Sequence, residues 1–247
     1  MSKPKALLLD MDGVMAEVSQ SYRGAIIETC KHFLNSSVVT NEVVSAKKAA
    51  GGCNNDWILS RDLISSNLPP GSAVPSLEEV TSRFEMIYQG HGETPGLHTL
   101  ETLIPSPGLL LELRRRCPTS MAVVTGRPKS DCAKFLDLHG ISGLFDVCVC
   151  MEDGPAKPDP FPVAEACRLL GVEPSDAVMV GDTPDDIRAG LEAGTRAVAV
   201  ATPDEHARGV LEKRGVETGE LARACLECGA ERVMKPGLAE LLEIFEP

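Results

Sequence analysis

The stretch that decides the fold is KALLLDMDGVM, residues 5–15. Apolar residues run unbroken from Ala6 to Leu9, a pattern typical of a strand that is buried on both faces of a sheet. Two carboxylates, Asp10 and Asp12, follow at once, and a glycine comes next. Like charges at this spacing repel each other, and an apolar neighbourhood disfavours both of them. The rest of the chain should therefore bring compensating charge to the end of this strand.

Further apolar runs resemble the first one and alternate with helical patterns from about residue 105 onward. This alternation is typical of an α/β fold in which helices cover both faces of a parallel sheet. We therefore predict a doubly wound, Rossmann-like parallel-sheet core. The expected strands are 120–126, 145–151, 176–182, 196–202 and 231–235, and the expected helices are 107–117, 129–140, 159–171 and 183–194.

A long helical segment separates the first strand from that series. Within it, Ser76 and Glu79 have the spacing of a capping box, which marks a helix start. The sequence thus predicts an α-helical cap domain, residues 16–104, inserted into a core formed by residues 1–15 and 105–247. The expected cap helices are 21–34, 40–51, 55–66 and 76–90, with a surface loop at 67–76.

Charge and composition exclude several classes of protein. The 247-residue chain has a formal net charge of −12, which disfavours binding to nucleic-acid polymers or anionic membranes. No apolar run approaches the length of a membrane-spanning helix. Nine scattered cysteines are typical of a reduced intracellular protein, and the single CxxC pair, Cys225 and Cys228, lacks the partners of a zinc site. We expect a cytoplasmic monomer or homodimer.

Polar side chains follow four of the expected strands at the point where each strand ends. A single aspartate in such a place is often only a turn or helix-capping residue. Because the carboxyl ends of parallel strands meet at one edge of a sheet, four such ends together indicate a ligand site. The residues are Asp10 and Asp12 after the first strand, Thr125 after the second, Lys157 after the third, and Asp182, Asp185 and Asp186 after the fourth.

The expected site carries more negative charge than Lys157 can neutralise. A hard divalent cation with oxygen ligands would supply the balance, and Mg²⁺ is the common choice beside phosphate. With such an ion bound, the site could accept a phosphate dianion. The candidate metal ligands are Asp10, Asp12, Asp182 and Asp186, and the candidate phosphate ligands are Thr125, the amide of Gly126, and Lys157.

Four short motifs, DMDGV (10–14), VVTGR (123–127), AKPDP (156–160) and VGDTPDD (180–186), resemble those of the haloacid dehalogenase-like hydrolase superfamily, in the same order. The resemblance covers nearly the whole chain. It implies that Asp10 attacks the phosphoryl group and forms an aspartyl-phosphate. It also implies that Asp12 is first the general acid toward the leaving oxygen and then the general base toward water.

The same resemblance assigns the remaining motif residues. It implies that Thr125 binds the phosphate and that Lys157 contacts both the phosphate and the nucleophile. It implies that Asp182 binds Mg²⁺ together with Asp10 and the Asp12 carbonyl, and that Asp186 supports the metal site. Asp185 does not match the spacing of the motif, so we expect it to be a residue of the helix N-terminus.

These features predict a Mg²⁺-dependent phosphomonoesterase that acts on a small phosphorylated metabolite. The acid at Asp12 argues against a dehalogenase or a phosphonate hydrolase, because the dehalogenases of this superfamily lack it and the phosphonate hydrolases that resemble this core usually lack it too. A hexose-phosphate mutase of the same superfamily remains an alternative. A phosphoryl-dependent switch is less favoured, because response-regulator receivers carry their aspartate after a middle strand and have no long helical insert.

The stretch AAGGCNNDWILSRD, residues 49–62, is the most unusual part of the expected cap. The resemblance places a substrate-specificity loop here, which makes Asn54, Asn55 and Trp57 candidate substrate-binding residues. The alternative is that one of the two asparagines caps a helix and that the tryptophan packs inside the cap. Arg127, next to the phosphate-binding motif, either faces the substrate or lies on the solvated surface.

Overall fold

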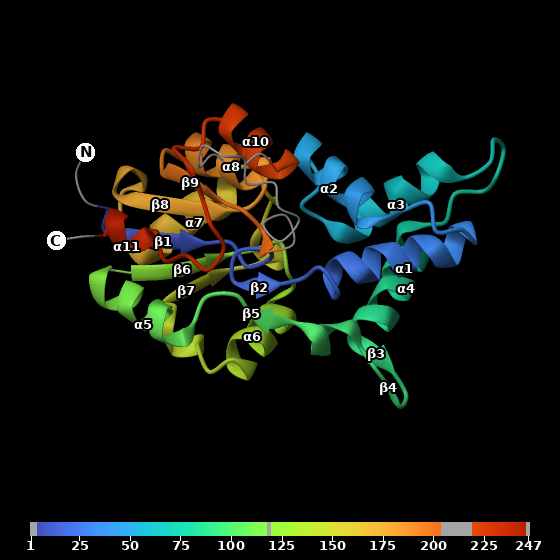
Figure 1. The fold of residues 1–247 in the computed structure, drawn as a ribbon, viewed down its shortest axis with the longest axis horizontal. Helices are drawn as coiled ribbons and strands as arrows, with labels where there is room; N and C mark the ends of the chain where they lie inside the picture. The colour runs from blue at the N-terminus through green and yellow to red at the C-terminus, as the bar shows by residue number, and fades with distance from the viewer. Residues whose placement is uncertain (1–3, 118–119, 204–218, 246–247) are drawn as a thin grey trace.

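A six-stranded parallel sheet lies at the centre of the computed structural model, which describes residues 4–117, 120–203 and 219–245 (Figure 1). The strand order is β10-β9-β8-β1-β6-β7. The predicted doubly wound core is thereby confirmed. The strands are β1 (Ala6–Leu9), β6 (Ser120–Val124), β7 (Val147–Val149), β8 (Ala177–Gly181), β9 (Arg196–Val200) and β10 (Val233–Met234).

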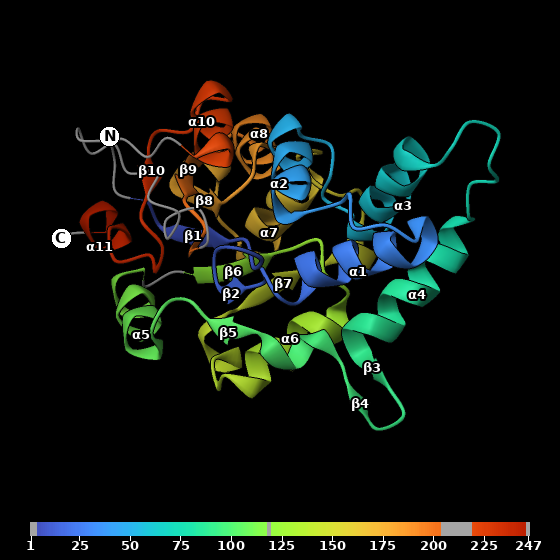
Figure 2. The same ribbon diagram turned by 45° about the vertical axis from the view of Figure 1, so that its right-hand side comes forward.

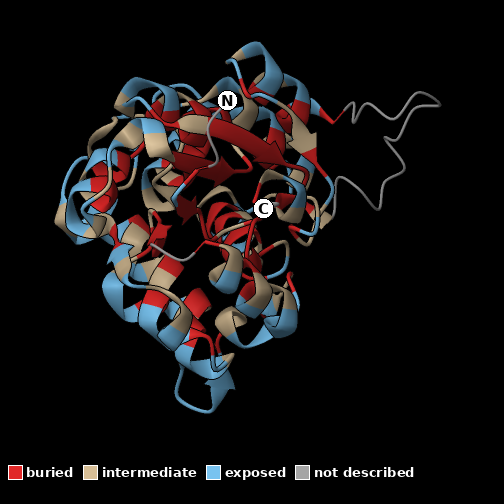
Figure 3. Ribbon diagram, turned by 90° about the vertical axis from the view of Figure 1, so that its left-hand side faces the viewer, coloured by how far each residue is buried: buried red, intermediate tan, exposed pale blue. Residues whose placement is uncertain are grey.

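The unbroken apolar run of β1 is explained by burial on both faces of the sheet, which Figure 3 shows as a buried layer. Leu7 and Leu9 pack into one hydrophobic cluster, whereas Ala6 and Leu8 pack into another, and all four side chains are fully buried. Alternate residues of a strand point to opposite faces, so both faces need apolar residues. Helices α5 (Pro107–Arg116) and α6 (Lys129–Leu138) contribute to the first cluster, and α7 (Phe161–Leu170) and α8 (Pro184–Ala193) to the second.

The four helices expected in the inserted segment are all present, to one side of the sheet (Figures 1 and 2). The predicted capping box starts the last of them: the Glu79 amide donates to the Ser76 hydroxyl, and the Ser76 amide donates to the Glu79 carboxylate. The second helix packs against α10 (Glu220–Glu227) of the core. The helices are α1 (Tyr22–Leu34), α2 (Asn41–Ala50), α3 (Asp56–Asn67) and α4 (Leu77–Gln89).

Two short strands that the sequence analysis did not predict join the helical segment to the core. Strand β2 (Ala16–Glu17) pairs antiparallel with β5 (Thr102–Leu103). The pair lies at the predicted cap boundaries, 16 and 104, where the chain enters the helical segment and where it returns to the core. The boundaries themselves stay a prediction, and we call the β2–β5 pair the hinge below.

The remaining elements are short. The helix expected to reach residue 90 ends at Gln89, because Gly90 turns out of the helix with φ = 90° into a small hairpin. None of the described helices has the length and apolar character that a bilayer crossing needs. These elements are β3 (Gly90–His91), β4 (Thr94–Pro95), α10 (Glu220–Glu227), α11 (Leu241–Ile244) and the 3-10 turns Leu97–Leu100, Ser142–Leu144, Met151–Asp153 and Pro174–Asp176.

Candidate active site

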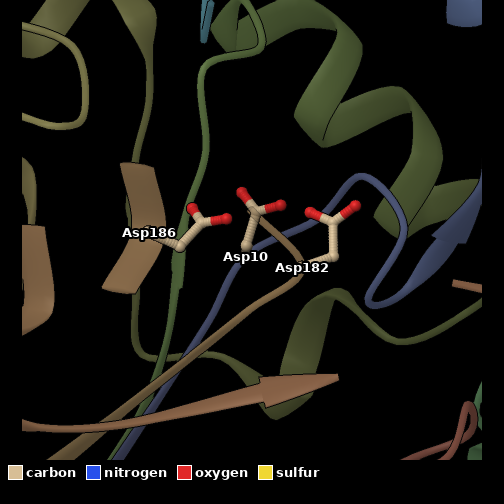
Figure 4. Close-up of side chains that lie close together, drawn as sticks. All are labelled: Asp10, Asp182 and Asp186. Atoms are coloured by element: carbon tan, nitrogen blue, oxygen red, sulfur yellow. The ribbon is translucent and has the colours of Figure 1, made fainter. Parts of the chain in front are cut away.

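Three buried carboxylates meet at the carboxyl edge of the sheet, and Figure 4 shows Asp10 between Asp182 and Asp186. One oxygen from each lies within 4.8 Å of the other two. Among the described residues, these three form the group of His, Cys, Asp and Glu side chains that is close enough to hold one metal ion. Cys225 and Cys228 lie outside it, at α10, where the Cys225 thiol contacts the Asp182 carbonyl oxygen at 3.5 Å.

Gly13 makes this approach possible. Its backbone has φ = 77°, which L-residues with a side chain rarely adopt. A Cβ atom at this position would lie 2.3 Å from Oδ2 of Asp182. The glycine that follows the two aspartates thus turns the chain away from the sheet and leaves room for the third carboxylate.

Burial changes the protonation of these carboxyl groups. It raises the pKa of Asp10 to about 7, with Lys157 opposing the shift and the neighbouring carboxylates adding to it. Burial also raises the pKa of Asp182 well above its usual value. The carboxylates are therefore poorly stabilised as anions by the protein alone, and oxygen donors of this kind suit a hard divalent cation. The donor set fits the Mg²⁺ that the sequence predicts.

Lys157 joins two of the three carboxylates. Its ammonium donates to Oδ1 of Asp10 at 2.6 Å, to Oδ1 of Asp186 at 2.5 Å, and to the Val124 carbonyl oxygen at 2.9 Å. Burial alone would lower the pKa of this lysine, but the two carboxylates raise it above its usual value. The amine is therefore charged, and it lies beside the candidate nucleophile as the sequence analysis expected.

Replacing Lys157 with methionine should destabilise the fold, because it leaves two buried carboxylates without their counter-charge. Removing one partner of a buried ion pair costs about 3–5 kcal/mol. We expect a loss of about 3 kcal/mol in the free energy of unfolding, measured by urea denaturation in metal-free buffer. Lys129→Met is the matched control, since Lys129 pairs with Asp153 on the exposed surface. Equal stability of the two variants would contradict the prediction.

Thr125 and Gly126 lie directly after β6, beside the acidic group. The Thr125 amide donates to the Val149 carbonyl oxygen at 2.9 Å, and its hydroxyl accepts from the Arg127 amide at 3.1 Å. A Cβ atom at Gly126 would lie 2.7 Å from Nδ2 of Asn54, so a glycine is needed where the cap reaches the core.

A pocket with an empty volume of ≈ 420 Å³ opens between the helical segment and the sheet edge. An adjoining pocket contains Thr125 and Lys157. The helical segment contributes two cations to the first pocket, Arg23 and Lys48. The first pocket is lined by Asp10, Asp12, Val18, Arg23, Lys48, Asn54, Asp56, Gly126, Asp182, Thr183 and Asp186.

Arg127 is buried in contact with Asp12. The alternative that it lies on the solvated surface is therefore wrong. Its side chain is 1% exposed. The guanidinium donates from Nε to Oδ1 of Asp12 at 2.7 Å and from Nη1 to Oε2 of Glu101 at 2.9 Å. Glu101 is buried as well, and no motif in the sequence distinguishes it.

The cap stretch divides into residues with different roles. Asn55 caps α3, because its side chain accepts from the amides of Trp57 and Ile58. The Trp57 indole donates to Glu85 at 3.0 Å, while its ring borders a pocket beside Asp12. Asn54 differs from both, because its Nδ2 atom is buried without a hydrogen-bond partner among the described residues. The residue lines both the pocket that contains Asp10 and the adjoining pocket that contains Lys157.

A carboxylate of the core holds this loop in place. Asp185 accepts from the Gly52 amide at 2.8 Å and from the Cys53 amide at 3.0 Å. It lies in the first turn of α8, as the sequence analysis expected, but these two contacts with the helical segment were not predicted. These two hydrogen bonds hold the loop so that Asn54 packs against Gly126.

Known proteins resemble this chain in sequence and in fold. A family model described as haloacid dehalogenase-like hydrolase matches residues 7–200. Imidazoleglycerol-phosphate dehydratase of Phytophthora nicotianae is 53% identical over 243 residues, which cover 98% of this chain and 53% of that one. The chain thus spans about half the length of this relative.

Two further comparisons cover most of both chains. Phosphoglycolate phosphatase of Aquifex aeolicus is 28% identical over 194 residues, which cover 78% of this chain and 82% of that one. A haloacid dehalogenase-like family hydrolase from Streptococcus pneumoniae has a TM-score of 0.71 at 16% identity, with full coverage of both chains. The structural likeness concerns the fold alone.

Proposed function

The chain belongs to the haloacid dehalogenase-like hydrolase family and is similar to its phosphatases over most of its length, and we propose that it is a Mg²⁺-dependent phosphomonoesterase. One observation carries the proposal: Lys157 contacts the buried Asp10 carboxylate, and Asp10 lines the same pocket as Asp12. A carboxylate can act as a covalent nucleophile once the charge of the phosphate is neutralised.

In the proposed first step, Asp10 attacks the phosphorus atom of the substrate. Lys157 holds Oδ1 of Asp10, so Oδ2 is the oxygen available for attack. As the bond from Asp10 to phosphorus forms, the ester bond breaks and the leaving oxygen takes a proton from Asp12. Thr125, the amide of Gly126 and Lys157 bind the oxygens of the phosphoryl group.

In the proposed second step, water releases the phosphate. The Asp12 carboxylate removes a proton from the water molecule, which attacks phosphorus and breaks the bond to Asp10. Inorganic phosphate leaves, and both aspartates return to their starting state. Asp10, Asp182 and Asp186, with the Asp12 carbonyl, would hold Mg²⁺, which supplies positive charge toward the phosphate when bound.

Release of inorganic phosphate from a panel of esters, in the presence of Mg²⁺, tests the proposal. The panel includes p-nitrophenyl phosphate, phosphoglycolate, sugar phosphates and nucleoside monophosphates. It also includes imidazoleglycerol phosphate, because a relative is named for that ester. Phosphate release from none of them would contradict the proposal, and formation of an isomeric sugar phosphate would favour the mutase alternative.

Asn54 is the cap residue that we expect to contact the substrate, because its Nδ2 donor is buried and unpartnered. Asn54→Ala should raise KM about 10-fold with a smaller change in kcat, since one hydrogen bond to a charged group contributes about 1.5 kcal/mol. Steady-state kinetics with the best ester of the panel measures the effect. Asn67→Ala is the control, because the Asn67 side chain donates to the Leu63 carbonyl oxygen of its own helix, away from the pocket. An unchanged KM in Asn54→Ala would exclude this contact.

A further inference from the structure

The guanidinium of Arg127 contacts one oxygen of the Asp12 carboxylate, Oδ1, and donates no hydrogen bond to the other, Oδ2. Nε and Nη2 both lie close to Oδ1, at 2.7 and 2.6 Å. In the described part of the chain, Oδ2 of Asp12 has no hydrogen-bond donor. The Asp12 side chain is 29% exposed and lines the pocket, whereas Arg127 is 1% exposed. The arrangement fixes the carboxylate while Oδ2 remains open toward the pocket.

Two aromatic rings keep the guanidinium itself from turning. Its central carbon lies 4.7 Å from the ring centre of Tyr22 and 5.3 Å from that of Phe135. Tyr22 begins α1 in the helical segment, and Phe135 belongs to α6 beside the sheet. A planar guanidinium suits such stacking better than an ammonium does, and its rigid fork of donors fixes the direction of the carboxylates that it contacts.

The second partner of Arg127 ties this arrangement to the hinge. Glu101 directly precedes β5, and β5 pairs with β2, only four residues beyond Asp12. Its Oε2 accepts from Arg127, and its Oε1 accepts from the Tyr88 hydroxyl of α4 at 3.0 Å. Both carboxylates that contact the guanidinium thus lie next to the strands of the hinge.

We propose that Arg127 and Glu101 are positioning residues that hold the Asp12 carboxylate for proton transfer, with Glu101 anchoring the guanidinium to the hinge. The inference rests on the proposed phosphatase function. Proton transfer needs the acid within about 2.6–3.2 Å of the leaving oxygen. Because Oδ1 accepts from Nε and lies in ion-pair contact with Nη2, Oδ2 is held at one place relative to Asp10. A carboxylate that is free to rotate would place Oδ2 at that position for a smaller fraction of the time.

The leaving group of the substrate distinguishes this role from a purely structural one. An alkyl ester such as glycerol 2-phosphate needs a proton on its leaving oxygen, whereas p-nitrophenolate departs readily without one. In Arg127→Lys and Glu101→Gln we expect kcat/KM to fall about 10²-fold for glycerol 2-phosphate and only a few-fold for p-nitrophenyl phosphate. Asp12→Asn should show the same imbalance more strongly. The ratio kcat/KM is chosen because it covers only the steps up to phosphoryl transfer.

Controls separate the possible outcomes. Arg196→Lys is the matched control, since Arg196 makes a two-point contact with Glu231 on the surface and should leave both esters unaffected. Equal losses on the two esters in both variants, or no loss, would overturn the positioning role. If Arg127→Lys fails to fold, the nearly isosteric Glu101→Gln decides. A wild-type protein that releases phosphate from glycerol 2-phosphate and from every ester of the panel at no measurable rate would remove the proposed function, and the positioning role with it.

Discussion

Replacing Asp10 with asparagine should lower phosphate release by about 10⁴-fold or more, as expected when a covalent nucleophile is removed. The amide has nearly the shape of the carboxylate, so the pocket keeps its form. It cannot, however, form the bond to phosphorus that the proposed first step requires. The measurement is kcat for p-nitrophenyl phosphate at saturating Mg²⁺, compared with the wild-type protein.

A surface aspartate serves as the control for this substitution. Asp176 pairs with Lys5 at the amino end of the sheet, far from the acidic group, so Asp176→Asn should keep the wild-type rate. Activity of Asp10→Asn within a few-fold of this control would sink the nucleophile assignment.

The same substitution should leave the fold as stable or make it more stable in metal-free buffer near pH 8. The pKa of Asp10 is about 7 in the folded protein, above its value of 3.8 when unperturbed. A carboxyl group with a raised pKa destabilises the fold at pH values above the unperturbed pKa, where the unfolded chain has already ionised. Asparagine removes that penalty, and thermal unfolding at pH 8 would show it.

The sheet and its reactive edge could be predicted from the sequence because local patterns determine both. The run from Ala6 to Leu9 has no polar residue, which favours a strand covered on both faces, and all four side chains are buried. Parallel strands then bring their carboxyl ends to one edge whatever the details of packing. Asp10, Asp182 and Lys157 meet there although up to 172 positions separate them in the chain.

Contacts between the helical segment and the core could not be predicted in the same way. Asp185 bonds to Gly52 and Cys53 across more than 130 residues, and the bonds depend on how α2 and α3 dock above the sheet. Glu101 bonds to Arg127 from a loop without any motif. The sequence offers no periodicity or spacing for such pairs, because they depend on tertiary docking.

The hinge escaped prediction for a different reason. Strands β2 and β5 contain two residues each, too few for an alternating pattern to show. Their pairing becomes visible only when the chain entering the helical segment lies beside the chain leaving it. This pairing also explains the position of Glu101, which directly precedes β5 and contacts Arg127 from there.

Removal of divalent metal should stop phosphate release and lower the melting temperature of the wild-type protein. Asp10, Asp182 and Asp186 are buried, and burial raises the pKa of the first two, so the positive charge of Lys157 does not offset the negative charge of the group. We expect EDTA to reduce the rate by about 10³-fold or more, with recovery on adding excess Mg²⁺. Binding at 100 times Kd stabilises a fold by about 2.7 kcal/mol.

That stabilisation corresponds to a rise of about 5–10 °C in melting temperature for a chain of this size. Asp182→Asn removes one carboxylate from the group, so its Mg²⁺-dependent rise should shrink or vanish, whereas Asp176→Asn should keep the full rise. Thermal unfolding measured with and without Mg²⁺ needs no substrate, so it tests the metal site even if the ester assay fails. A wild-type protein whose melting temperature and rate ignore both EDTA and Mg²⁺ would rule out the metal site, because three buried carboxylates cannot bind a divalent cation without changing the stability of the fold.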